Sequence, residues 1–255
     1  MKKEITRRQL LGYGAVMGGT LAGGAMLGND MAIAGKDKKT WAYHELDPAE
    51  TEKLGYEGFY EGRCCFGTFK SIIGQLGDKY GAPYEDFPFE MMKYGTAGVA
   101  FWGTLCGAMN GTAAAVGLLL SGEDRDKIIT SLYAWYEKTE FPIYSPPKPV
   151  HDCNMPKTSA GSVLCHRSVG KWLQASGNTF ISKEKLERCA RVAADAAKKA
   201  VELLNAHLHG TFKEGAISTT ASSCLACHGI EKEANALSKM DCRICHGDKL
   251  PHPKR

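Results

Sequence analysis

The sequence lacks a strong excess of charge of either sign. Its net charge at pH 7 is +4 over 255 residues. The first 34 residues contribute +2 of this, with Lys2, Lys3, Arg7 and Arg8 against Glu4 and Asp30. The rest of the chain therefore carries only +2, a balance that gives no basis for binding nucleic acid or an anionic membrane surface.

Long uninterrupted apolar runs are also missing. The stretch from Leu10 to Ala34 is rich in small apolar residues, but it contains seven glycines together with Asn29 and Asp30. A transmembrane helix needs about 20 consecutive, predominantly apolar residues. An uncleaved membrane anchor is therefore disfavoured at this end of the chain.

Instead, the first 34 residues have the features of an export signal. A charged start leads into Thr6-Arg7-Arg8-Gln9-Leu10-Leu11, and the apolar run ends at Ala32-Ile33-Ala34. This pattern is typical of a twin-arginine signal with a cleavage site. We expect a periplasmic protein that starts near Gly35 and keeps no stable membrane anchor. Because this route exports folded proteins, often after a cofactor has been inserted in the cytoplasm, it hints at such a cofactor.

The sequence also lacks a phosphate-binding loop and an evident pair of acid and base residues. It does contain two C-x-x-C-H motifs, Cys224-Leu225-Ala226-Cys227-His228 and Cys242-Arg243-Ile244-Cys245-His246, eighteen residues apart. This motif marks covalent attachment of c-type haem: the thiols bind the porphyrin and the histidine binds its iron.

We therefore predict two haem c groups per chain. The covalent tethers are Cys224, Cys227, Cys242 and Cys245, and the proximal iron ligands are His228 and His246. A zinc site made of two Cys-x-x-Cys pairs is the alternative. Haem is favoured because zinc does not require a histidine directly after both pairs.

Helical patterns dominate the remaining sequence. We expect helices from Asp47-Pro48 towards Gly77, over 104–120, from a cap at Asp124 through Trp135, over 162–175, and from Ser182 to about Leu208. Five prolines between 141 and 160 predict a long irregular connection. The expected fold is mainly α, with a helical cysteine-containing domain (35–210) and a small irregular di-haem segment (211–255).

Six of the ten cysteines lie outside the haem motifs: Cys64, Cys65, Cys106, Cys153, Cys165 and Cys189. Most of them fall within apolar helical stretches. Export permits disulfides, so buried thiols or disulfides are one interpretation. The other is an iron–sulfur centre held by four thiolates from separate helices.

The surroundings of these cysteines resemble a known family. The blocks are Arg63-Cys64-Cys65-Phe66-Gly67-Thr68-Phe69, Leu105-Cys106-Gly107-Ala108-Met109-Asn110-Gly111, Ser162-Val163-Leu164-Cys165-His166-Arg167-Ser168 and Glu187-Arg188-Cys189-Ala190. Together they resemble the C-GCAxxG-C-C family of redox proteins. With the two haem motifs, residues 45 to 255 resemble the split-Soret cytochromes c of sulfate-reducing bacteria.

This resemblance implies a mainly helical homodimer with the haems at the shared end. It implies two bis-histidine haems per chain, with distal histidines supplied across the dimer. It also implies an iron–sulfur centre on Cys106, Cys165, Cys189 and one of Cys64 or Cys65. The Cys64-Cys65 doublet departs from the single cysteine of the family, and Cys153 is additional.

The distal haem ligands are drawn from the other histidines. His207 and His209 rank first, because they end the long helix just before the haem segment. His166 beside a cluster cysteine and His151 in the proline-rich connection follow, and His44 and His252 complete the set. Met240 remains an alternative ligand.

Two imidazoles on each iron would leave no open position for a substrate, which favours electron transfer with redox protein partners. The first alternative is a haem- or cluster-based reductase of a small inorganic nitrogen or sulfur species. The second is a thiol redox sensor.

Overall fold

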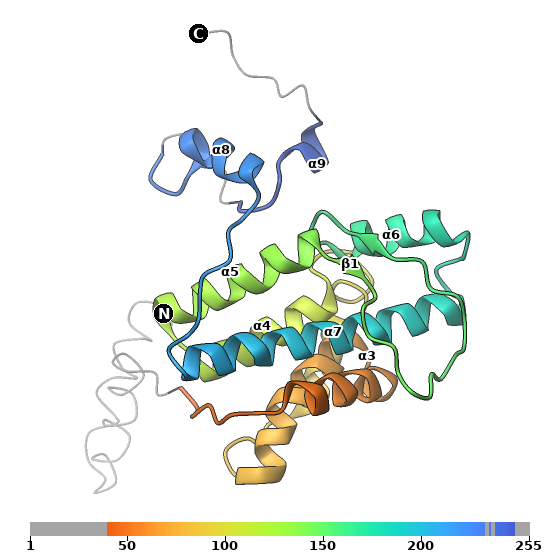
Figure 1. The fold of residues 1–255 in the computed structure, drawn as a ribbon, viewed down its shortest axis with the longest axis vertical. Helices are drawn as coiled ribbons and strands as arrows, with labels where there is room; N and C mark the ends of the chain where they lie inside the picture. The colour runs from red at the N-terminus through yellow and green to blue at the C-terminus, as the bar shows by residue number, and fades with distance from the viewer. Residues whose placement is uncertain (1–39, 233–234, 236–237, 248–255) are drawn as a thin grey trace, which may run out of the picture. The chain divides into compact units, whose positions relative to one another are not determined.

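The computed structural model describes residues 40–232, 235 and 238–247; the expected export signal and His252 lie outside these residues. The described residues from Trp41 onward form one compact unit. Its elements are α3 (Pro48–Tyr80), η1 (Phe89–Gly95), α4 (Gly107–Leu119), α5 (Gly122–Lys138), β1 (Glu140–Phe141), β2 (Thr158–Ser159), α6 (Cys165–Ser176), α7 (Lys183–Leu208), α8 (Thr219–His228) and α9 (Arg243–His246) (Figure 1). The mainly α fold expected from the sequence is confirmed.

Helix α3 starts where the sequence predicts. The Asp47 side chain accepts a hydrogen bond from the Ala49 amide, Pro48 occupies the first turn, and Gly81 ends the helix at a φ of 71°. These are the usual starting and ending signals of a helix. The continuous helix expected up to Gly77 is nevertheless wrong, because α3 is broken in the middle.

The break in α3 lies at Arg63, whose φ of 72° and ψ of −175° are not helical. The chain changes direction there, so that the two halves of α3 pack against each other at Gly58 and Gly67. A Cβ atom on Gly58 would lie only 2.9 Å from the Cα atom of Gly67. Glycine therefore allows a backbone contact that turns the residues after Arg63 towards the rest of the molecule.

Helix α7 is the long helix that the sequence predicts. The Ser182 side chain caps it by accepting from the Lys185 amide, and it runs to Leu208. Helices α3, α4 and α5 all contact it. The contact with α3 is close because Gly55 faces small residues: a Cβ on Gly55 would lie 3.0 Å from the Cβ of Ala197.

Three helix starts differ from the predicted ones. Helix α6 begins at Cys165 rather than at residue 162. Helix α4 begins at Gly107 rather than at residue 104, because residues before it form an antiparallel bridge between Leu105 and Leu164. Helix α5 begins at Gly122, and its cap position is Ser121 instead of Asp124. Asp124 lies in the first turn, where a negative charge interacts favourably with the helix dipole.

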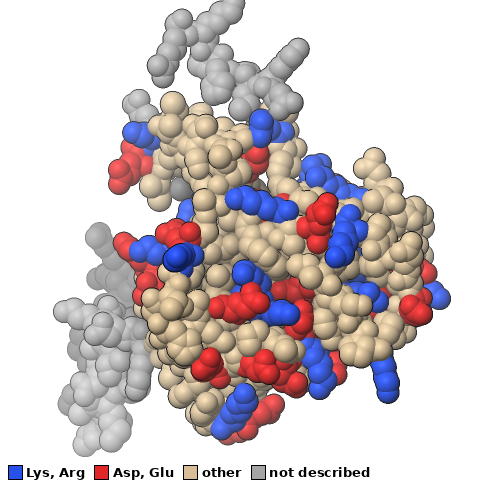
Figure 2. All heavy atoms as spheres, viewed as in Figure 1, with Lys and Arg blue, Asp and Glu red and all other residues tan. Residues whose placement is uncertain are grey.

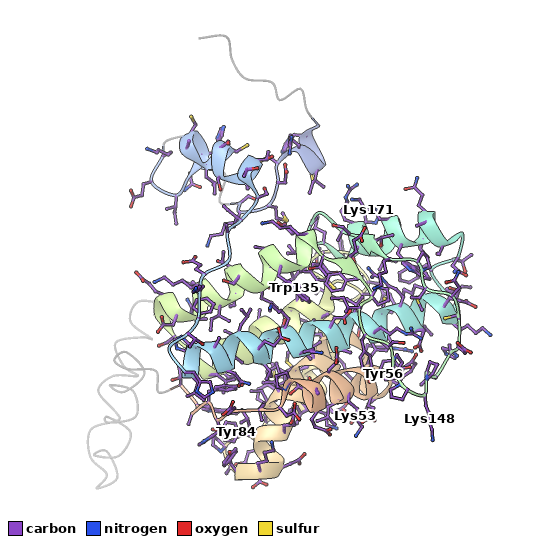
Figure 3. All side chains as sticks on the ribbon, viewed as in Figure 1. Lys53, Tyr56, Tyr84, Trp135, Lys148 and Lys171 are labelled. Atoms are coloured by element: carbon purple, nitrogen blue, oxygen red, sulfur yellow. The ribbon has the colours of Figure 1, made fainter. Side chains whose placement is uncertain are left out.

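The proline-rich connection is irregular, as expected, and is fixed by hydrogen bonds to buried side chains. The two carboxylate oxygens of Asp195 accept from the amides of Ile143 and Tyr144, at 2.9 and 2.8 Å. Farther along, the Tyr56 hydroxyl accepts from the Val150 amide at 2.8 Å. Figure 3 labels Tyr56 and Lys148, which mark α3 and this connection. Strands β1 and β2 pair antiparallel at its two ends.

The segment with the haem motifs follows α7. In α8 and α9 the only buried residue is Ala221. Polar contacts join this segment to α5, including Gly215 N to Ser131 Oγ at 2.8 Å and Lys239 Nζ to Thr130 Oγ1 at 2.9 Å. No described helix is both long and apolar enough to cross a membrane. On the face shown in Figure 2, basic and acidic side chains are interspersed.

Gly67→Ala is expected to destabilise the fold, because the new Cβ would lie 2.6 Å from the Phe59 amide nitrogen and 2.7 Å from the Gly58 carbonyl carbon. We expect the free energy of unfolding to fall by about 1–3 kcal/mol in denaturant titrations. The control is Gly117→Ala in α4, where nothing lies within 4 Å. That variant should be neutral or stabilised by about 0.5–1 kcal/mol; equal effects of the two substitutions would contradict the close contact.

Glu137 of α5 gives the stability a pH dependence. Burial, with a smaller contribution from the Asp241 carboxylate, raises the pKa of Glu137 from 4.5 to about 7. The stability that this group contributes is therefore present below about pH 4.5 and lost as the pH rises through about 7.

The substitution Glu137→Gln removes the ionisable carboxyl group and with it this loss of stability at high pH. We expect the variant to match the unsubstituted protein at pH 4 and to exceed its free energy of unfolding at pH 8 by up to about 3 kcal/mol. The exposed Glu140→Gln is the matched control. Superimposable stability curves of Glu137→Gln and the unsubstituted protein between pH 4 and 8 would contradict this assignment.

Candidate functional site

Four cysteines far apart in the sequence line one cavity of about 260 Å³. They are Cys64 of α3, Cys106 at the start of α4, Cys165 at the start of α6 and Cys189 of α7. Phe59, Ala108, Val169 and Val192 contribute apolar parts of the wall. The structure thus brings together one cysteine from each of the four sequence blocks.

Cys106 and Cys165 are neighbours because of the backbone bridge between Leu105 and Leu164. The Cys106 amide donates to the Val163 carbonyl at 2.8 Å, and the Cys165 amide donates to the Thr104 carbonyl at 2.7 Å. Cys106 is the cap residue of α4 and Cys165 is the first residue of α6. The positive ends of two helix dipoles therefore lie close to these thiols, which favours their thiolate forms.

The two cysteines of the doublet point to different environments. Cys64 lines the cavity, whereas Cys65 is fully buried in the apolar core. Two glycines make room for them: a Cβ on Gly107 would lie 2.2 Å from the Cys64 Sγ, and one on Gly95 would lie 2.4 Å from the Cys65 Sγ. Of the two residues that the sequence could not separate, Cys64 is the candidate ligand.

Cys153 also lies apart from the cavity. Its thiol donates to the His151 carbonyl at 3.3 Å within the proline-rich connection. No two of the ten cysteines are joined by a disulfide bond in the structure. The described residues contain no set of three or more His, Cys, Asp or Glu side chains already close enough to hold a single metal ion. The four thiols instead surround an open volume.

Burial controls the protonation of these thiols. It raises the pKa of Cys64 to about 12, with the neighbouring Cys106 as the next cause. Burial is also the main reason why the pKa values of Cys106 and Cys165 are raised. Cys64, Cys106 and Cys165 are therefore neutral near pH 7, and a metal that binds them must displace their protons.

The buried guanidinium group of Arg188 lies beside the thiols, where it would balance the charge of an anionic metal centre. Arg188 is only 1% exposed and lines the same cavity. Its Nε atom has no hydrogen-bond partner, although it is buried. A buried polar atom without a partner is costly, and iron–sulfur centres held by thiolates are anionic. The donor set of four cysteines and one buried guanidinium is therefore consistent with such a centre.

A left-handed turn forms part of the cavity rim and was not predicted. Residues 97–101 all have positive φ, between 47° and 72°, although only Gly98 is a glycine. Left-handed residues other than glycine cost roughly 1–2 kcal/mol each. The turn places the Ala97 amide against the Cys64 sulfur. The glycines at 95, 98 and 103 were the only sequence signal for it.

Both haem motifs occupy short helices. Cys224, Cys227 and His228 end α8, while Cys242 caps α9, which contains Cys245 and His246. After burial, the neighbouring Cys224 is the next cause of the raised pKa of Cys242. The first tethers of the two motifs therefore lie next to each other, so two attached porphyrins would be neighbours.

The candidate distal histidines are spread over the structure. At the end of α7, His209 Nε2 lies 3.0 Å from Glu45 Oε1, and His207 Nε2 lies 3.9 Å from Asp124 Oδ2. His166 is exposed at the start of α6. His151 contacts the Tyr60 ring, and His44 stacks on Tyr80 with ring centroids 3.9 Å apart. Their roles remain predictions.

Met240 lies in a second cavity, of about 440 Å³, between α5 and the haem segment. Tyr133 and Glu137 line it from α5, and Ile217 lines it from the connection to α8. The Met240 sulfur is 3.8 Å from the Ser162 hydroxyl, which donates to it. Met240 is therefore engaged by a side chain of the cysteine domain, and its role as a ligand also remains a prediction.

The doublet provides a direct test of the cavity. Cys64→Ser removes one of the four thiols, and we expect loss of non-haem iron from the purified protein. Cys65→Ala removes a core side chain, and we expect iron retention with a free energy of unfolding lowered by about 1 kcal/mol. Metal analysis and denaturant titration check the two outcomes. Loss of iron from Cys65→Ala but not from Cys64→Ser would reverse the assignment.

Comparison with known proteins agrees with this arrangement. Residues 66–203 match the profile of the C_GCAxxG_C_C family of redox-active proteins. The match includes Cys106, Cys165 and Cys189, begins just after the doublet and ends before the haem motifs. The resemblance inferred from the cysteine blocks is thus confirmed.

A characterised relative extends the similarity to the haem segment. The chain is 38% identical over 270 aligned residues to "Split-Soret cytochrome c" of Desulfovibrio desulfuricans (strain ATCC 27774 / DSM 6949 / MB), covering 95% of each chain. A solved structure with 40% identity covers 82% of this chain and 91% of its own, with a TM-score of 0.77. It is described as "A novel iron centre in the split-Soret cytochrome c from Desulfovibrio desulfuricans ATCC 27774". The chain therefore belongs to the C_GCAxxG_C_C redox protein family and, within it, to the split-Soret cytochromes c.

Proposed function

We propose that this redox cytochrome transfers single electrons between two c-type haems and an iron–sulfur centre. The observation that carries the proposal is the convergence of Cys64, Cys106, Cys165 and Cys189 on one cavity in the same chain as two haem motifs. The haems and the centre would supply one-electron chemistry. The protein would hold them in place and control their surroundings.

Each motif would tether one haem. Cys224 and Cys227 are one helical turn apart on α8, the spacing that two thiols need to bind one porphyrin. His228 and His246 would bind the irons. The contact between Cys224 and Cys242 supports two closely spaced haems, between which electrons would move readily.

Bis-histidine coordination is the second part of the proposal. His207 and His209 are the first candidates, since both lie at the end of α7 and their rings approach Asp124 and Glu45. A carboxylate beside a histidine fixes the orientation of the ring and raises its basicity as a ligand. With both axial positions filled, the irons would exchange electrons without binding substrate.

We further propose a periplasmic homodimer that exchanges electrons with other redox proteins. Export rests on the twin-arginine pattern and on haem attachment, which takes place outside the cytoplasmic membrane. The dimer is supported by the haem segment, in which only Ala221 of α8 and α9 is buried. Such a segment cannot enclose two porphyrins, so a second copy of the chain would cover them.

Composition analysis of anaerobically purified protein tests the cofactors. We expect two haems per chain, additional non-haem iron, acid-labile sulfide, and an intact mass that lacks residues 1–34. Removal of the non-haem iron with a chelator should leave the haem spectrum unchanged. Two irons per chain without sulfide would exclude the iron–sulfur centre and leave a di-haem cytochrome.

A reductase of a small inorganic substrate is the competing function. The same sample distinguishes the two, because six-coordinate haem must lose a ligand before it binds a small molecule. Electron transfer predicts that carbon monoxide leaves the spectrum of the reduced protein unchanged at first. An immediate spectral shift would favour an open coordination site and therefore the reductase.

A further inference from the structure

Arg188 is the side chain whose burial the fold does not explain by itself. It lies in α7 next to Cys189 and is almost completely buried. Its Nη2 donates to the Ser168 hydroxyl at 2.8 Å, but its Nε has no partner. No acidic side chain in the part of the chain that the structure describes forms an ion pair with it.

A neighbouring buried arginine, Arg191, has the carboxylate partner that Arg188 lacks. Arg191 lies one turn further along α7, and its Nε donates to Glu187 Oε1 at 2.8 Å. The Glu187 carboxylate also accepts hydrogen bonds from the Tyr56 and Tyr60 hydroxyls, so three side chains already engage it. Arg188 thus faces the cysteine cavity without the carboxylate that balances Arg191.

A buried charge without a partner is strongly unfavourable. No described Asp or Glu side chain lines the cavity that Arg188 faces. Four thiolates around an iron–sulfur centre would provide this partner, because such a centre carries net negative charge. The position of Arg188 therefore fits a cavity that holds an anionic metal centre.

Three of the four cysteines have a hydrogen-bond donor of their own. The Ala97 amide of the left-handed turn contacts the Cys64 sulfur, the Tyr136 hydroxyl contacts Cys106, and the Arg188 guanidinium contacts Cys189. These donors come from three different parts of the fold. Donors to the sulfurs are one of the features that set the reduction potential of an iron–sulfur centre.

Arg188 and Tyr136 also act together. The Ser168 and Tyr136 hydroxyl oxygens are 2.8 Å apart, and Ser168 accepts from Arg188. The Tyr136 hydroxyl donates to Ser168 and also contacts Cys106. The hydroxyls of Ser168 and Tyr136 thus connect the buried positive charge to a second cysteine of the cavity.

We propose that Arg188 is a charge-balancing residue that makes the cavity selective for an anionic metal centre and raises the reduction potential of that centre. The proposal rests on the proposed iron–sulfur function. Reduction adds one electron, supplied in the test by dithionite, and so adds one negative charge to the centre. A fixed positive charge in a site of low dielectric stabilises the reduced form more than the oxidised form.

The test uses the haem-containing full-length protein and two substitutions at one position. Arg188→Met keeps an unbranched stem, although a shorter one, and removes the charge, while Arg188→Lys keeps the charge. Arg191→Met is the matched control, because it removes one positive charge from the same helix but faces Glu187. Three measurements are made on each variant.

The first measurement is the midpoint potential of the non-haem centre in a dithionite titration followed by electron paramagnetic resonance. We expect Arg188→Met to shift the potential downward, Arg188→Lys to restore most of it, and Arg191→Met to change it least. An unchanged potential in Arg188→Met would overturn the role in tuning.

The second measurement uses Co²⁺ alone as the probe, after chelators have removed the non-haem iron. Binding is followed by equilibrium dialysis and metal analysis, since the haems dominate the visible spectrum. Arg188→Met should bind Co²⁺ about tenfold more weakly or worse, the loss expected for one charge-assisted hydrogen bond. Equal affinity in Arg188→Met and the unsubstituted protein would overturn the role in selectivity.

The third measurement separates charge balance from a structural role. In the protein without non-haem metal, Arg188→Met should be at least as stable to denaturant as the unsubstituted protein, because it removes an unbalanced buried charge. A large loss of stability in that state would show instead that Arg188 holds the fold. If native protein contains no non-haem iron or sulfide, the proposed function fails, while the Co²⁺ arm still decides the role of Arg188.

Discussion

The backbone bridge between Leu105 and Leu164 is the interaction on which the cysteine cavity depends. Two hydrogen bonds, from Cys106 to Val163 and from Cys165 to Thr104, fix the first residues of α4 and α6 side by side. Side chains of paired extended residues alternate between faces, so a slip by one residue would turn both thiols away from the cavity. The broken helix α3 and the long helix α7 then supply Cys64 and Cys189 against this fixed edge.

Much of the fold could be predicted because its signals are local. Asp47-Pro48 and Ser182 start helices through contacts within the first turn, and Gly81 ends one through its own backbone freedom. The four cysteine blocks could be recognised because each is a short run of residues. Their convergence on one cavity agrees with the family that the chain belongs to.

The features that could not be predicted depend on contacts between distant segments. The break at Arg63 is sustained by the packing of Gly58 on Gly67, and the turn at 97–101 is held by hydrogen bonds within 94–104. Cys64 and Cys65 are adjacent on one helix, so periodicity alone could not say which faces the cavity. The burial of Arg188 could not be predicted, because nothing in its local sequence distinguishes it from an exposed arginine on a helix.

The separation of the cavity cysteines along the chain has a consequence for the order of assembly. Residues 64 and 189 must both be in place before the cavity exists, so it forms only when most contacts between distant segments have formed. Closing such long loops is slow and carries an entropic cost. Each C-x-x-C-H motif, by contrast, is complete within five residues and can present its thiols on a nascent helix. A metal centre in the cavity would therefore be inserted only after folding is complete, whereas attachment of haem to the motifs would not depend on it.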